Sequence, residues 1–184
     1  MAHRFLLAAA ALAGLPVLAG CGGGGPTNPD SALRFYKATL EPTGETRVEG
    51  AAFIDVVGGD LRVRVHATGI GPGEHVPQHI HLNRGCDPAG PVLLNLDAGL
   101  TVPGEGLGTG DAFPAANRSG VIDYEATRPL DELRSALVTR GGPSLHDTEA
   151  LLAYLDLEDR NIHLHVAYGP PFPAVACGGV EQIH

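Results

Sequence analysis

Two pairs of histidines are the residues of this chain best suited to chemistry. His79 and His81 form one pair, His163 and His165 form the other, and one apolar residue separates the members of each. In a β-strand, residues two apart project from the same face, so each pair presents two imidazoles on one side. Two such pairs on neighbouring strands would bring up to four imidazoles together. Neutral imidazole suits copper and zinc, and near-planar nitrogen sets suit Cu(II).

The alternative interpretation is that these histidines are solvated on an exposed sheet face. Two pairs, each backed by apolar residues on the opposite face, favour a metal site instead. His75 and His66 have a different context, and we expect each to be a structural histidine that hydrogen-bonds a loop.

The elements that must position these side chains are short strands. Alternation over Leu61–Thr68 predicts a half-buried antiparallel strand, joined through Gly58–Asp60 to a partner over Thr46–Val57. Leucine spacing predicts two short helices, at Arg128–Thr139 and Asp147–Tyr154, with Ser144 or Asp147 as the N-cap of the second. Further strands are predicted at Leu33–Leu40, His75–Leu82, Val121–Ala126 and Ile162–Ala167. Regular short strands between Gly and Pro turns favour an all-β fold, an antiparallel barrel or sandwich.

The first 30 residues predict export and lipid anchoring. Residues 1–20 have a basic start and an apolar run, Phe5–Leu18, which is short for a membrane span and typical of a signal peptide. Leu18–Cys21 resembles a bacterial lipobox, in which cleavage precedes the Cys and its sulfur receives a lipid. The alternative is an ordinary signal peptide with a stray Cys. Residues 21–30 would then be the lipidated Cys and a flexible linker. Residues 31–184 would form one domain, held in the cell envelope and facing the periplasm or the exterior.

The charge of the chain excludes some partners. The net charge of −9 becomes about −10 without residues 1–21, which contain Arg4 and no acid. This argues against nucleic acid, which needs clustered Lys and Arg, and against electrostatic docking on anionic lipid. Membrane attachment is therefore expected only through the N-terminal lipid.

Cys86 and Cys177 remain if Cys21 carries a lipid. In an exported domain, two cysteines most simply form one disulfide, and the alternative is two free buried thiols.

Five segments, in order along the chain, resemble the Cu/Zn superoxide dismutase family: Gly69–His81, Gly85–Gly90, Asn117–Val121, Ile162–Val166 and Val175–Val180. The resemblance implies a Greek-key antiparallel β-barrel or sandwich. It also implies three copper ligands, His79, His81 and His165, and a buried His75 that supports the copper strand. The same resemblance implies a Cys86–Cys177 disulfide that pins the active-site loop.

The departures from that family concern the second metal. Pro91–Asn95 contains no His where the family has the imidazole that bridges copper and zinc, and Asp111 is only a loose match for the zinc-binding Asp. The position of the family's arginine that guides superoxide to the copper falls near Ala174 in this sequence. With these departures, the resemblance implies one copper ion, no zinc, and dismutase activity below the family norm. His163 stands where the family has an apolar residue at the copper site, which makes it a candidate fourth ligand.

A second resemblance is to CHRD domains, in the segments Val76–His81 and Thr148–His165. Three functions stay open: a copper-dependent dismutase acting on superoxide, a non-catalytic copper-binding protein for buffering or delivery, and a metal-free structural domain that keeps the fold alone.

Overall fold

The computed structural model describes residues 33–105, 112–166 and 173–184. The predicted signal segment, Cys21 and Asp111 lie outside the described residues. Within the described residues, no helix is both long enough and apolar enough to cross a membrane.

Eight antiparallel strands form one sheet that curls into a half-barrel, which confirms the expected all-β fold with short helices. The neighbour order is β5-β4-β7-β8-β1-β2-β3-β6. Long connections place β4 beside β7, β1 beside β8 and β3 beside β6. The strands are β1 (Arg34–Pro42), β2 (Glu49–Val57), β3 (Asp60–Thr68), β4 (Gln78–His81), β5 (Val92–Asn95), β6 (Ile122–Pro129), β7 (Asn161–His165) and β8 (Ala174–Ile183).

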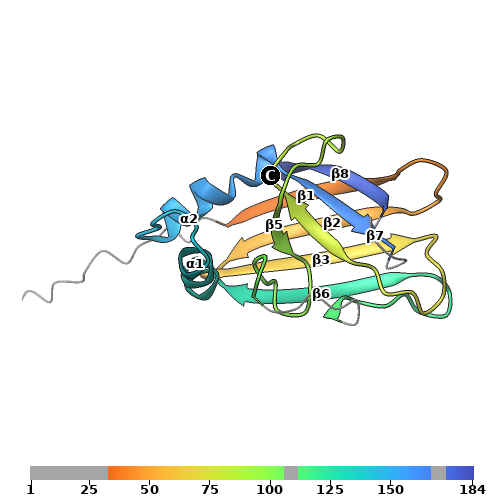
Figure 1. Ribbon diagram of the computed structural model, residues 1–184, viewed down its shortest axis with the longest axis horizontal. Coiled ribbons are helices and arrows are strands. Elements are labelled where there is room, and N and C mark those ends of the chain that lie inside the picture. The colour runs from red at the N-terminus through yellow and green to blue at the C-terminus, as the bar shows by residue number, and fades with distance from the viewer. Residues whose placement is uncertain (1–32, 106–111, 167–172) are drawn as a thin grey trace, which may run out of the picture.

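The core lies inside the curl of the sheet. In β3 the burial alternates residue by residue, with Leu61 and Val63 buried and Arg62 exposed, as the sequence pattern predicts. Strands β4, β5 and β7 cross in front of β1, β2, β3 and β6 (Figure 1). Fully buried apolar residues such as Ile54 and Ile80 belong to the one core cluster that lies between these two parts of the sheet.

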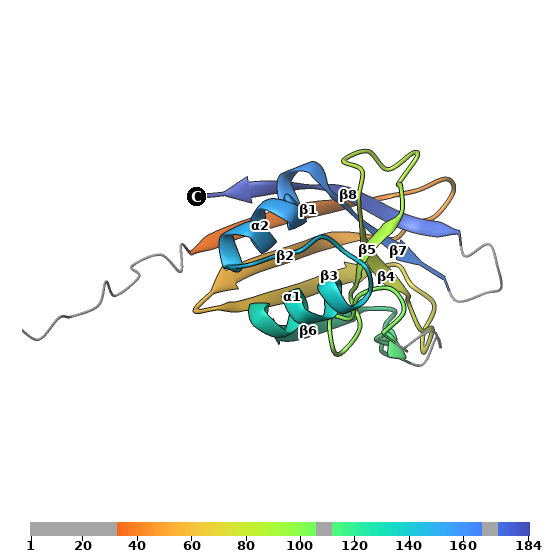
Figure 2. The same cartoon turned by 60° about the vertical axis from the view of Figure 1, so that its left-hand side comes forward.

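Two short helices, α1 (Leu130–Thr139) and α2 (Thr148–Leu155), lie at one end of the strands (Figure 2). Their buried leucines complete the core cluster. The carboxylate of Asp147 accepts a hydrogen bond from the amide of Ala150 at 2.7 Å, so Asp147 is the N-cap of α2. The prediction that α1 begins at Arg128 was wrong by two residues, because β6 continues to Pro129 in register with β3.

Strands β5 and β8 were not predicted, and β4 is half as long as predicted. β4 covers Gln78–His81 rather than His75–Leu82, because Pro77 has no amide hydrogen for a ladder and His75 makes only an isolated bridge with Ala115. β5 and β8 lack the alternation that identified the others. In β8, a side chain at Gly178 would collide with the carbonyl oxygen of Thr39, so glycine is required where β8 passes close to β1.

Candidate metal centre

The antiparallel pairing of β4 with β7 brings the two histidine pairs together. His79 lies opposite His163, and Ile80 lies opposite Ile162. Both isoleucines are fully buried in the core, so the imidazoles, which alternate with them, occupy the outer face of the sheet. The prediction of two H-x-H pairs on neighbouring strands is therefore confirmed.

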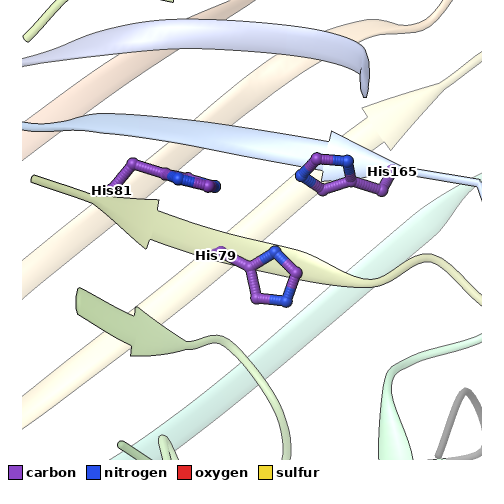
Figure 3. Close-up of side chains that lie close together, drawn as sticks. All are labelled: His79, His81 and His165. Atoms are coloured by element: carbon purple, nitrogen blue, oxygen red, sulfur yellow. The ribbon is translucent and has the colours of Figure 1, made fainter. Parts of the chain in front are cut away.

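Three of these histidines form a group that could hold a metal ion. One ligand nitrogen from each of His79, His81 and His165 lies within 4.8 Å of the others. Two rings come from β4 and one from β7, and the three gather around a common space (Figure 3). The ring centroids of His79 and His165 are 5.2 Å apart, and those of His81 and His165 are 6.1 Å apart.

His163 flanks this group. Its ring centroid lies 4.7 Å from that of His81 and 5.6 Å from that of His165. Among the described residues, however, the atoms within 4.8 Å of its ligand nitrogen that form a second candidate group are the sulfurs of Cys86 and Cys177. Its role as a fourth ligand to the three-histidine group stays a prediction.

Hydrogen bonding identifies the nitrogens that are available to a metal. Nδ1 of His81 lies 2.9 Å from the carbonyl oxygen of Gly90, and a carbonyl can only accept, so Nδ1 carries the proton and donates. Nε2 of His81 then has a free lone pair. This atom and Nδ1 of His79 are buried and have no hydrogen-bond partner among the described residues. A backbone carbonyl that fixes one ring nitrogen while the other faces the site is typical of a metal-binding histidine.

The surroundings keep the imidazoles of His79, His81 and His163 neutral. Burial, with a smaller contribution from His165, His81 and His163, lowers the pKa of His79 to about 3. Burial, together with His81 and His165, lowers the pKa of His163 to about 4. Burial also lowers the pKa of His81, and the Gly90 carbonyl opposes that shift. Metal binding near neutral pH would therefore not require these rings to lose a proton.

A disulfide-linked loop, residues 82–90, covers one side of the cluster. The Cys86–Cys177 disulfide implied by the resemblance is present, with its Cα atoms 6.0 Å apart. Cys177 lies opposite His163 in the β7–β8 pairing, so the disulfide sits beside the imidazoles. As a result, His81 is 7% exposed and His163 is 5% exposed, although both occupy the outer face of the sheet.

Asn161 is a residue of the site that the sequence analysis did not find. It is fully buried, and its Nδ2 donates to the carbonyl oxygens of Asn83 at 2.5 Å and Gly85 at 2.8 Å. These bonds fasten the disulfide-linked loop to β7. The sequence feature that could have identified Asn161 is its position two residues before His163, which puts it on the same face of the strand.

Residues 112–115 lie beside the cluster at His79. The ring of Phe113 meets that of His79 edge to face, with centroids 5.5 Å apart. The carbonyl of the same Phe113 accepts a hydrogen bond from Nδ1 of His75 at 2.9 Å, so His75 makes the loop contact expected of a structural histidine. His66 lies on the exposed face of β3 and is not part of the cluster.

No family model matches the chain, and its comparison with curated proteins finds no significant relative. The dismutase and CHRD resemblances therefore depend on the sequence motifs alone.

Proposed function

We propose that this chain is a copper-binding protein of the superoxide dismutase-like type, tethered to the bacterial cell envelope through lipid on Cys21. Its ligands would be His79, His81 and His165. One observation carries the proposal: three imidazoles from two strands converge, and two of them present a buried ring nitrogen with no hydrogen-bond partner among the described residues. An all-imidazole donor set suits copper, which accepts it in both oxidation states.

The residues of the chain would perform distinct tasks around the ion. Copper supplies one-electron redox chemistry when it is bound. The Gly90 carbonyl holds the Nδ1 proton of His81 and thereby directs Nε2 into the site. Phe113 packs against His79 and limits the rotation of its ring. The disulfide-linked loop excludes water from one side, which strengthens any interaction between ligand nitrogens and a cation.

The reaction proposed for this site is dismutation of superoxide at a rate below the family norm. The position that corresponds to the guiding arginine is Ala174, which lies opposite His165 in the pairing of β7 with β8. Superoxide would therefore approach without the guanidinium that the family has at this position.

A second candidate function is copper buffering or delivery without catalysis. The observation that favours it is the fourth imidazole, because the ring of His163 lies 4.7 Å from that of His81. A fourth imidazole would take up a coordination position on copper that a three-ligand site leaves to superoxide.

Copper titration with electron paramagnetic resonance tests the proposal. We expect one Cu(II) per chain, with nitrogen hyperfine structure from imidazoles that is lost in His165→Ala. The matched control is His66→Ala, which removes an exposed imidazole from β3 and should bind copper as the wild type does. Equal copper binding in His165→Ala and the wild type would refute the site. Dismutation by the loaded protein that does not exceed that of free copper would leave the buffering function and refute the enzymatic one.

A further inference from the structure

A second set of metal-ligand atoms includes His163, which flanks the three-histidine group. The sulfurs of Cys86 and Cys177 and one ring nitrogen of His163 all lie within 4.8 Å of one another. His163 is 5% exposed, and its Nε2 is buried with no hydrogen-bond partner among the described residues. His163 thus combines a ring nitrogen close to two sulfurs with a buried Nε2 that has no hydrogen-bond partner among the described residues, a combination that the disulfide alone does not explain.

The disulfide prevents these sulfurs from binding a metal in the oxidised protein, because the thiolate is the ligand form of cysteine. A dithiol reductant changes this. Two electrons pass from the dithiol to the protein, the Cys86–Cys177 bond breaks, and the reductant forms its own S–S bond. Its two protons pass to the cysteine sulfurs.

We propose that reduction of the Cys86–Cys177 disulfide creates a second metal site, formed by the two cysteine thiolates and the imidazole of His163. Two thiolates and one imidazole suit a thiophilic ion such as Cu(I) or Zn(II). Binding displaces one proton from each thiol, so two protons are released for each ion bound. This proposal does not depend on copper binding by the three-histidine group.

The site does not depend on the disulfide alone for its position. Cys177 belongs to β8 and stays opposite His163 through the β7–β8 ladder. The loop that carries Cys86 is fastened by the side chain of Asn161 and by the backbone hydrogen bond from Leu82 to Pro91, at 2.9 Å. These contacts hold the two sulfurs near His163 when the covalent bond between them is broken.

The position of Cys86 gives an ion access to this site. Cys86 is exposed, whereas Cys177 is 3% exposed and His163 is buried. An incoming ion would therefore meet the Cys86 sulfur first and the two buried ligands afterwards. The redox state of one disulfide would decide whether the chain offers one ligand group or two.

Cadmium(II) is the probe for the test, because its thiolate complexes absorb in the ultraviolet. The protein is His79→Gln/His165→Gln, which lacks two ligands of the three-histidine group, so failure of that group cannot affect the result. It is reduced with a dithiol under anaerobic conditions, freed of reductant and titrated with cadmium(II). We expect one cadmium per chain and a thiolate charge-transfer band, with neither in the oxidised protein.

Two further substitutions in this background identify the ligands. Cys86→Ser should at least halve the band, because one of the two thiolates is lost, and His163→Ala should weaken cadmium binding by about tenfold or more. Absence of the band in the reduced protein would overturn the proposal, and so would an unchanged affinity in His163→Ala. If circular dichroism shows that reduction unfolds the chain, recovery of the fold on adding cadmium, dependent on His163, supports the site. Failure to recover overturns it.

Discussion

Acid should weaken the metal-free protein through its buried imidazoles. Burial lowers the pKa of His79 from 6.5 to about 3, and that of His163 from 6.5 to about 4. Between these values and 6.5, the unfolded chain binds a proton at each residue that the folded chain does not. The free energy of unfolding is therefore at its full value above pH 6.5 and falls as the pH drops toward the folded-state pKa values.

The magnitude follows from the same pKa values. Between about pH 7 and about pH 5, protonation of one unfolded-state imidazole with a pKa of 6.5 costs the folded protein about 2 kcal/mol. The folded-state pKa of either residue lies below this range, so almost none of this loss is recovered by protonation of the native state. His79 and His163 together should lower the stability by about 4 kcal/mol.

Urea unfolding at the two pH values, with a chelator present and the disulfide intact, measures this loss. His79→Gln stays neutral throughout, so its loss of stability between the two pH values should be about 2 kcal/mol smaller than that of the wild type. The control is His66→Gln, which removes an exposed histidine from β3. The reasoning fails if His79→Gln and the wild type lose equal stability on acidification.

Other substitutions test the packing around the site. Gln78→Met should raise the free energy of unfolding by about 1–3 kcal/mol, measured by urea unfolding, because both amide atoms of Gln78 are buried without a partner among the described residues. Asn161→Ala should lower it by about 2–3 kcal/mol and speed proteolysis of the loop that Asn161 fastens; an unchanged cleavage rate would contradict this. Ile80→Ala should cost about 2–5 kcal/mol, whereas Val138→Ala on the exposed side of α1 should cost far less; equal losses would contradict the core assignment. His163→Ala should weaken copper binding, measured by competition with a chelator, if His163 is a fourth ligand, and unchanged affinity would exclude that role.

The alternating strands could be predicted from the sequence because one face of each is buried. Leu61–Thr68 alternates strictly, and the structure forms β3 there from Asp60 to Thr68. β8 could not be predicted in this way. Four buried residues in succession, from Val175 to Gly178, interrupt the alternation, since one face of that strand packs on the core and the disulfide-linked loop covers the other.

The histidine cluster was predictable in part. Spacing alone placed His79 with His81, and His163 with His165, on one face of each strand. Alternation identifies the side of a sheet to which a residue points, but it does not identify what covers that side. The burial of His81 therefore depends on the loop that Asn161 holds, a contact between residues 76 to 78 positions apart that no local pattern reports.

The burial of these imidazoles argues for a ligand rather than for a role in stability. A buried ring nitrogen without a hydrogen-bond partner costs about 1–3 kcal/mol, and Nδ1 of His79 and Nε2 of both His81 and His163 are buried in this way. Apolar side chains on the same face would pack beneath the loop without that cost. The chain instead buries neutral imidazoles whose ring nitrogens lack partners, an arrangement that becomes favourable when a cation binds their lone pairs. Removing the lone pairs should then stabilise the metal-free protein and abolish its metal binding, a combination that a purely structural histidine cluster would not produce.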